Sequence, residues 1–472
     1  MRKLIIIQLM IVAGFSPASY AQTKINMDTY LEQVKQSNPA YKASAQASEG
    51  AKLRAQEGSL ITLPQIEIDA SKTVDESQPT SSNMGDKNTY ERYSVSLLQN
   101  TTFGLAGKLS YGHNYTLTEN GNAMLNSDYW YGYHRASPSV ELSQSLWKNF
   151  FGSEVRAQKD ALTSAGEAVQ YAERAKNLGV IIEAQNTYYR LYYAQKTTRA
   201  VKESLDAAQK LKNWAQKRMN QSLGEKSDYF QTKASLESRE LEYLQAQIDE
   251  RVAARAYNSL RGINSDNVTE TLDAPVSPPF NKLSFSEKIW RDDVRAASKQ
   301  AIAAKAQSLL SKERNRPTLK LYGKYAWTGL DEDGKKAHDE SMADNYPVYT
   351  YGVRFKAPLA FWKSSDVVEG YHKEAMAADL EFKRKAQEQE RDYEDLISKI
   401  ETAQLKYKLA STLEESQKAK LQEERRRHDR GRTTFFQVLQ FEQEYLGSQL
   451  NKIKTEAELN TLLTQLQQYR GE

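Results

Sequence analysis

The chain has 472 residues and no cysteine, which excludes disulfide bonds and thiolate metal sites. Its 65 basic and 61 acidic residues give a formal charge of +4, so the charge offers no reason to expect a nucleic-acid partner. The hydrophobic fraction is only 39%, and this composition suits long helices with a narrow apolar seam better than a thick globular core.

The N-terminal segment 1–21 is predicted to be a secretory signal peptide. Arg2 and Lys3 form a basic start, residues 4–15 are mostly apolar, and the small residues Ser19 and Ala21 suit a cleavage site. We therefore expect the mature chain to leave the cytoplasm. Beyond the signal, no window approaches eighteen uninterrupted apolar residues, so a membrane role would have to be carried by a β-barrel.

A first structural repeat is predicted over residues 22–262. It begins with a helical pattern from about Asp28 to Leu60, which Asn38–Pro39 interrupts. At Pro64 the hydrophobic period changes to two, and four candidate strands follow between about 62 and 146.

A long helical hairpin closes this repeat over 153–262. The sequence is nearly free of helix breakers as far as Met219, and continuous helix over that length would measure on the order of 100 Å. The chain is expected to turn near Leu223–Gly224. A linker over 263–285, which contains three prolines, then separates the two halves.

The second repeat is predicted over 286–472, and its elements follow in the same order. A helix precedes strands over about 317–357, and a hairpin over 364–470 turns at Gly431. The two hairpin tips match at an offset of about 209 residues, which indicates one duplicated unit.

The strands carry charged residues on one face and apolar or aromatic residues on the other. Such strands fit a soluble sandwich or an outer-membrane barrel. The barrel is favoured, because tyrosine and tryptophan concentrate in the strands, too few strands exist to close a sandwich, and the long helices leave the strands at one end. The charged residues expected to face the lumen are Glu67, Asp69, Lys320, Lys324 and Arg354.

Two antiparallel helical hairpins cannot bury their apolar seams within one chain, so oligomerisation is expected. Packed side by side in a ring, such hairpins enclose a water-filled tube. The fold class expected is therefore mostly α with β: coiled-coil hairpins that form a tunnel, continuous with a shared transmembrane barrel.

At this point the chain resembles the TolC-like outer-membrane efflux proteins over essentially its whole mature length. The most specific segment is 427–446, RHDRGRTTFFQVLQFEQEYL, and residues 37–40, 144–147 and 357–360 are also similar to the family. The resemblance implies a homotrimer in outer-membrane lipid, with a periplasmic helical tunnel. It further implies a passive exit duct for tripartite efflux or type I secretion, with a periplasmic adaptor and an inner-membrane transporter as partners.

The resemblance also implies a gate at the hairpin tips. Asp228 matches an acidic position that pairs with the second hairpin in the family prototype. The position of its tyrosine partner is His428 and that of its arginine partner is Thr433, with Arg430 and Arg432 nearby. The residues expected to contact the adaptor are Ser222, Leu223, Gly224 and Gly431.

A departure from the family lies at the constriction. Two aspartates that form an acidic ring in the prototype align with Gln437 and Gln440. Because amides do not concentrate cations as carboxylates do, weaker block by multivalent cations is predicted. A second prediction is that Asp228→Ala loosens the closed state.

Two further segments leave alternatives open. The family pattern is two strands in each half, so the additional pair around 91–117 either enlarges the barrel or forms a hairpin outside it. The arginine-rich run 423–432 is either a solvated helix end or a docking or gating surface. A loop is predicted over Asp331–Tyr346. Its first four residues, 331–334, resemble part of a calcium loop, but the remaining ligands are missing at the required spacing, so an exposed surface loop is expected there.

An alternative class is a periplasmic coiled-coil envelope scaffold without a pore, against which the lumen charges argue. An enzyme is not expected, because the five histidines lack metal-ligand spacing and neither a phosphate-binding glycine loop nor a nucleophile elbow occurs. No cofactor or metal is predicted, and the sequence does not identify the substrate.

Overall fold

The computed structural model describes residues 24–78, 87–119, 132–268, 270–275, 290–343, 346–357, 359 and 361–469. The predicted signal peptide and parts of the predicted linker and strand ends, including 129–131, lie outside these residues. The chain divides into two compact units. Unit 1 comprises residues 1–43, 176–289 and 392–472, and unit 2 comprises residues 44–175 and 290–391.

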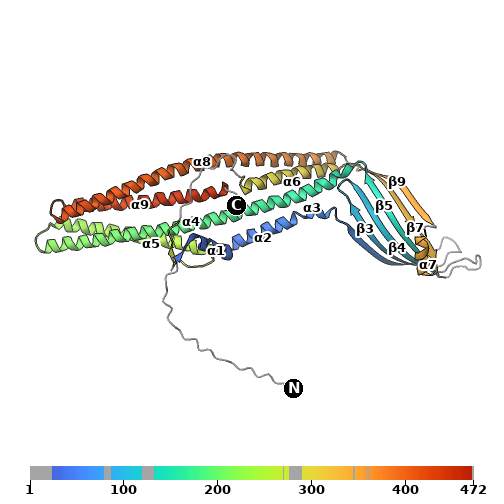
Figure 1. Cartoon of the computed structure of the whole chain (residues 1–472), viewed down its shortest axis with the longest axis horizontal. Coiled ribbons are helices and arrows are strands. Elements are labelled where there is room, and N and C mark those ends of the chain that lie inside the picture. Colours follow the sequence, from blue (N-terminus) through green and yellow to red (C-terminus); the bar gives the residue numbers. More distant parts are fainter. Residues whose placement is uncertain are drawn as a thin grey trace, which may run out of the picture. The chain divides into compact units, whose positions relative to one another are not determined.

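Unit 2 contains one antiparallel sheet whose strands lie side by side (Figure 1). Their order is β2 (Gln65–Asp75), β3 (Lys87–Asn100), β4 (Leu105–Glu119), β5 (Gly132–Ser145), β7 (Thr318–Trp327) and β9 (Pro347–Lys356). A short strand, β8 (Gly329–Asp331), pairs with β5 beside the end of β7. Among the described residues, the first half contributes four strands to this sheet, over 65–145, and the second half contributes three, where two were predicted.

The additional strand pair joins the sheet. β3 and β4 are central strands between β2 and β5, and their registers pair along their full lengths. The connecting turn runs from Thr101 to Gly104, where Gly104 has a φ of 85° that suits glycine. The alternative of a hairpin outside the sheet is therefore wrong for this chain.

The prediction of a surface loop over Asp331–Tyr346 is also wrong. This segment contains α7 (Gly334–Met342), which packs against β5 and β8. The Asp333 carboxylate caps the helix by accepting the Lys335 N–H at 2.8 Å, so Asp333 and Gly334 begin a helix. Ala337 of α7 is fully buried.

The helices of unit 2 approach one another closely where small residues meet. They are α2 (Pro39–Arg54), α3 (Glu57–Leu60), the first part of α4 (Ser153–Asn220), α6 (Asp292–Arg314) and the first part of α8 (Phe361–Asp429). A side chain at Gly58 would lie 2.8 Å from the Lys159 carbonyl oxygen, and one at Gly166 would lie 2.7 Å from the Cα of Ala55. Lys299 of α6 pairs with Glu167 of α4 at 2.7 Å.

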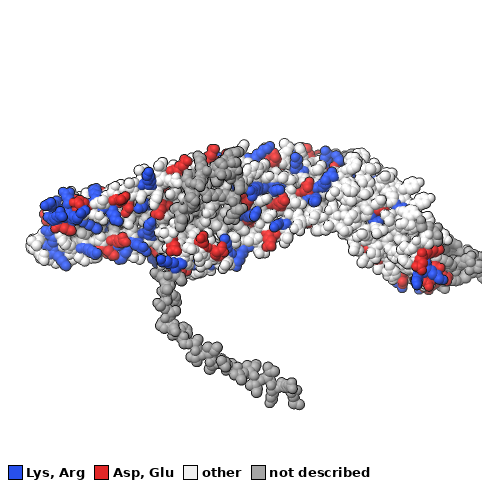
Figure 2. Space-filling view, viewed as in Figure 1, with Lys and Arg blue, Asp and Glu red and all other residues white. Residues whose placement is uncertain are grey.

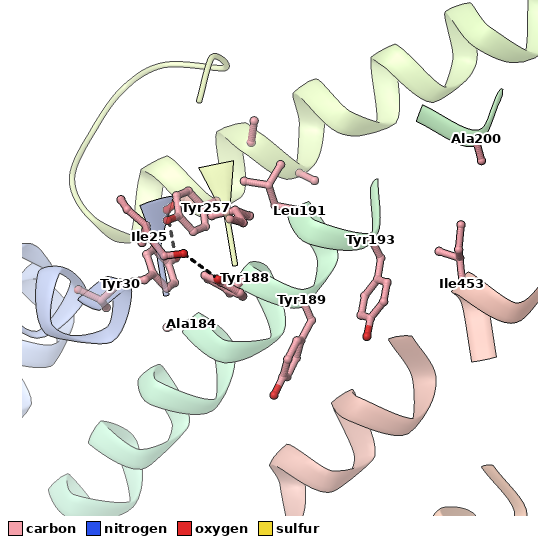
Figure 3. Close-up of a cluster of buried hydrophobic side chains, with 14 of the residues drawn as sticks. Ile25, Tyr30, Ala184, Tyr188, Tyr189, Leu191, Tyr193, Ala200, Tyr257 and Ile453 are labelled. Carbon is pink, nitrogen blue, oxygen red and sulfur yellow. Dashed lines mark hydrogen bonds between the residues drawn. The ribbon is translucent and has the colours of Figure 1, made fainter. Parts of the chain in front are cut away.

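Unit 1 is built around buried tyrosines that join α1 (Met27–Ser37), α4 and α5 (Lys226–Leu260) (Figure 3). Tyr30 stacks on Tyr257 with ring centroids 4.1 Å apart, and its hydroxyl donates to the Tyr257 carbonyl at 3.1 Å. The Tyr188 hydroxyl lies 2.9 Å from the Ile25 carbonyl oxygen. Burial raises the pKa of Tyr30 to about 12 and raises those of Tyr188 and Tyr257 as well.

Two long helical hairpins are present, over 153–260 where 153–262 was predicted and over 361–465 where 364–470 was predicted. The first is α4 followed by α5, and the second is α8 followed by α9 (Phe435–Gln465). The helix before β7 starts at Asp292, and its predicted start at 286 lies outside the described residues. Part of the predicted linker forms β6 (Thr271–Leu272), which pairs in parallel with β1 (Lys24–Ile25). In the described part of the chain, no helix is both long and apolar enough to cross a membrane.

Candidate functional site

The two hairpin tips of unit 1 close with the same backbone turn. At the first tip, the Leu223 N–H donates to the Arg218 carbonyl and the Ser222 N–H to the Met219 carbonyl. At the second, Arg432 and Gly431 donate to Arg427 and His428 in the same way. This is the Schellman arrangement, in which the residue after the helix is left-handed. Gly431 fits it with a φ of 70°, whereas Ser222 adopts a φ of 61° despite its side chain.

An aromatic cluster connects the two hairpins near these turns. Trp214 of α4 stacks on Phe435 of α9, and His428 lies edge-on to both rings, with centroids 5.1 Å from Trp214 and 5.8 Å from Phe435. The Arg218 guanidinium lies over the Trp214 ring at 4.8 Å. We name Trp214, Arg218, His428 and Phe435 the tip cluster. Of these four, sequence reasoning identified only His428 as a gate residue.

Within this chain, Asp228 does not pair with its predicted partners, the residues of the second hairpin tip. Asp228 lies in the first turn of α5, and no ion pair joins it to another described residue. Thr433 bonds within its own hairpin instead, since its hydroxyl contacts the Glu424 carboxylate and the Gln437 side-chain oxygen. Glu424, which is only 5% exposed, also pairs with Arg427. Its burial follows no local pattern of the sequence and was not predicted.

Gln437 and Gln440, the residues at the predicted constriction, are both exposed on α9. The Gln440 amide donates to Glu444 at 3.0 Å, and Lys420 of α8 pairs with the same carboxylate at 2.9 Å. These contacts orient both amides along one hairpin, while leaving their surfaces open to solvent.

The arginine-rich run is partly paired and partly free. Arg425 pairs with Glu442 at 2.7 Å, and Arg426 pairs with Glu423 at 3.0 Å. Arg430 and Arg432 form no ion pair with a described residue. Lys and Arg gather at the tip of the α8–α9 hairpin in Figure 2. The tips also expose apolar groups, because Leu223 is 65% and Phe436 is 57% exposed.

The sheet of unit 2 carries its charges on one face. Register partners share a face, and the registers place all five charged residues predicted to line a lumen on the same side. Lys108, Glu141 and Lys324 are successive partners across β4, β5 and β7. Glu67 of β2 extends this row by pairing with Lys108 at 3.4 Å.

The opposite face of the sheet is apolar and uncovered over most of its area. Its exposed residues include Ile66, Ile68, Val95, Leu97, Leu109, Leu142, Leu321, Tyr349, Tyr351, Val353 and Phe355. Tyr351 is 81% exposed, and Ile68 is 73% exposed. In Figure 2 few charged residues appear over the strands, whereas they gather where α7 lies. An exposed apolar face of this size marks a surface that contacts another apolar surface, either of a protein or of a membrane.

Helix α7 lies against the end of the apolar face. The Tyr111 hydroxyl and the His338 Nδ1 are 2.8 Å apart, and His113 Nε2 lies 3.0 Å from His134 Nδ1. Within the described residues, no group of three histidine or acidic side chains is arranged to hold a metal ion.

Comparison with solved structures identifies the class of fold. The chain superposes on the outer-membrane channel OprN with a TM-score of 0.64 and 16% identity, covering 94% of this chain and 90% of that one. For the outer membrane protein VceC of Vibrio cholerae the TM-score is 0.63 and the identity 17%, over 94% of this chain and 96% of that one. For the open state of the outer membrane channel MtrE of Neisseria gonorrhoeae, the TM-score is 0.57 and the identity 16%, over 93% of this chain and 88% of that one.

The fold is therefore that of the outer-membrane channels. Residues 288–472 match the model of the outer membrane efflux protein family. Comparison with curated proteins gives no match.

Proposed function

We propose that the chain is an outer-membrane exit duct that works as a homotrimer. The observation that carries the proposal is the division of the sheet into a charged face and an exposed apolar, aromatic face. In a membrane barrel the first face lines an aqueous lumen and the second contacts lipid. The match of residues 288–472 to the outer membrane efflux protein family supports the same function.

The helical hairpins then form a periplasmic tunnel beneath the barrel. Each chain contributes two hairpins with similar tip turns, which supports an internal duplication. The tunnel carries cargo for tripartite efflux or type I secretion without an energy source of its own. The inner-membrane transporter supplies that energy and also the choice of cargo.

The hairpin tips contact the periplasmic adaptor in this proposal. Leu223 provides an exposed apolar group beside Ser222 and Gly224, while Arg430 and Arg432 flank Gly431 with free positive charge. Leu223→Asp is expected to leave the trimer and its conductance intact and to abolish transport in cells. A matched change on the sheet, Thr350→Asp, is expected to leave transport unchanged.

The lipid-facing assignment is tested with a pair of neighbouring lysine substitutions. Tyr351→Lys places a charge on the apolar face, and Thr350→Lys places the same charge on the polar face. Lysine on the lipid side of a barrel costs about 2–4 kcal/mol near the midplane and little in the lumen. Tyr351→Lys should therefore reduce assembly of heat-modifiable trimers in the outer-membrane fraction, while Thr350→Lys should not.

Planar-bilayer recordings of the purified protein test the pore itself. Discrete conductance steps are expected. A trimer in the envelope that conducts nothing, and in which the two lysine variants behave alike, would instead support a coiled-coil envelope scaffold.

A further inference from the structure

The two hairpins of unit 1 meet at two levels, and a groove separates them in between. At the first level, the Asn460 amide of α9 donates to the Tyr193 hydroxyl of α4 at 2.6 Å. At the second level, Trp214 stacks on Phe435 in the tip cluster. Between these contacts, α4 faces α8 and α9 across a groove of about 560 Å³, which we name the inter-hairpin groove. A volume of this size suits a small organic ligand.

The floor of the inter-hairpin groove is apolar. Ala200, Leu421 and Leu446 come from α4, α8 and α9, and each is only 4% exposed. Ala207 and Leu211 of α4 line the groove as well and are partly buried. An alanine side chain is a single carbon, so α4 leaves this space open, whereas its aromatic side chains cross to α9 at the two flanking levels. The groove therefore offers an apolar surface that these three helices do not fill themselves.

The α4 rim of the groove carries a carboxylate without an ion-pair partner. Glu203 lines the groove and forms no ion pair with a described residue. Asp206 lies one turn further and pairs with Lys202 of the same helix at 2.9 Å. Lys210 also lines the groove, but it lies two turns from Glu203, about 10 Å along the helix axis. The charge of Glu203 is thus available to a ligand.

The opposite rim is electrically balanced and presents an aromatic ring. Arg425 of α8 pairs with Glu442 of α9 at 2.7 Å, and Tyr445 lines the groove one turn further along α9. Burial raises the pKa of the Tyr445 hydroxyl, and the carboxylates of Glu414 and Glu203 raise it further, so Glu203 acts across the groove on this residue. An available carboxylate and an aromatic ring above an apolar floor suit a cation with an apolar body.

We propose that the inter-hairpin groove binds a small amphipathic cation, with its charge against Glu203 and its apolar body on Leu421 and Leu446. Such a ligand contacts α4, α8 and α9 together, so its binding favours the spacing of the two hairpins in this structure. The site is separate from the predicted constriction, since neither Gln437 nor Gln440 lines the groove. The inference goes beyond the proposed function, because a single chain forms the whole groove.

Two ions of nearly the same shape and opposite charge test the groove. Tetraphenylphosphonium and tetraphenylborate are each dialysed to equilibrium against the purified full-length protein in its assembled form. The same measurement on Ala207→Trp, which fills the groove, gives the uptake by detergent, so the difference between the two proteins measures binding in the groove. Saturable binding of tetraphenylphosphonium is expected at one ion per chain, with tetraphenylborate bound about tenfold more weakly.

Glu203→Gln removes the charge and keeps the shape of the side chain. It should weaken the binding of tetraphenylphosphonium about fivefold, because an ion pair in a partly exposed site is lost. Glu423→Gln and Ala419→Trp are the matched controls, since both residues are exposed on α8 and do not line the groove. Both controls should bind tetraphenylphosphonium as the wild type does.

Two results would overturn the proposal. The first is uptake by the wild type that does not exceed that of Ala207→Trp, which would mean that the assembled protein has no open site there. The second is binding that Glu203→Gln leaves unchanged, or that is equally tight for both ions, since the site would then not select a cation. Planar-bilayer conductance of the same preparation reports on the pore separately. A conducting channel without binding would overturn this inference alone, and binding without conductance would overturn the proposed function alone.

Discussion

Trp214 of α4 stacks on Phe435 of α9, with ring centroids 5.4 Å apart and ring planes inclined by 13°. The two residues belong to different hairpins, and Phe435 is the first residue of α9. Phe435 and Val438 are buried at this point of unit 1, whereas the neighbouring Phe436 is exposed. The stack therefore holds the tips of the two hairpins together within one chain.

Trp214→Ala is expected to loosen the tips. Removing the ring deletes its stack on Phe435 and its edge contact with His428, and aromatic pairs contribute about 0.5–1.5 kcal/mol beyond their area burial. The variant should show higher conductance and faster proteolysis at the turn after Asn220. Phe436→Ala is the control, because it removes an exposed ring of the same segment. Equal conductance in the two variants would contradict a closing role for the stack.

Asp228→Ala is expected to raise conductance. The Asp228 carboxylate lies near the positive N-terminal end of α5 and has no ion-pair partner among the described residues. In the proposed trimer, Arg430 or Arg432 of a neighbouring copy would be its gating partner, since neither forms an ion pair with a described residue of its own chain. Asp228→Asn keeps the shape and removes the charge, so the two variants should behave alike. If conductance stays at the wild-type level in both, Asp228 does not hold the gate.

Gln437→Asp combined with Gln440→Asp is expected to create block by multivalent cations. The wild-type amides are exposed and carry no charge, whereas the variant would place six carboxylates at the predicted constriction of the proposed trimer. Titration of a trivalent cation on the periplasmic side of a planar bilayer should block the variant at much lower concentration than the wild type. Tight block of the wild-type channel would contradict the expected site of the constriction or the effect of the amides there.

The stability of unit 1 is expected to fall above pH 10. Burial raises the pKa of Tyr30 to about 12 from an ordinary value of 10, because the phenolate is disfavoured in the core. The unfolded chain then loses this proton first, so the stabilisation is complete below pH 10 and is lost as the pH rises toward 12. Tyr188 and Tyr257 act in the same direction.

Denaturant unfolding followed by circular dichroism between pH 8 and pH 11 measures this effect. Tyr30→Phe removes one titrating group together with the hydrogen bond to the Tyr257 carbonyl. It should lower stability at pH 8 and flatten the decline above pH 10. A decline as steep as that of the wild type would show that Tyr30 does not contribute to it.

The sequence predicted the faces of the sheet because they depend on local alternation. Glu67, Asp69, Lys320, Lys324 and Arg354 all lie on the polar face, since a period of two assigns sides without knowledge of the partner strand. The hairpin turns at Leu223–Gly224 and Gly431 were likewise local signals. The tip cluster could not be predicted in the same way, because Trp214 and Phe435 lie far apart in the chain and meet only after both hairpins have formed.

The helix α7 escaped prediction for a different reason. Its nine residues are too few for a clear helical period, and Asp333–Gly334 resembles a turn. What fixes α7 in place is a close contact with Gly329 of β8. A side-chain carbon at Gly329 would lie 2.0 Å from the Ala337 carbonyl oxygen and 2.4 Å from the Ser341 nitrogen, so only glycine allows the helix to reach the sheet.

Gly329→Ala is therefore expected to displace α7 while the sheet remains folded. The added methyl group overlaps backbone atoms, which cannot rotate away, and overpacking of this kind costs about 1–3 kcal/mol. The contact between Tyr111 and His338 should be lost as well. Limited proteolysis of membrane-inserted protein should cleave the variant within 334–342 much faster than the wild type. Gly323→Ala, in β7, is the matched control, because a side-chain carbon there has no neighbour within 4 Å. If both variants resist protease equally, the Gly329 contact does not hold α7 against the sheet.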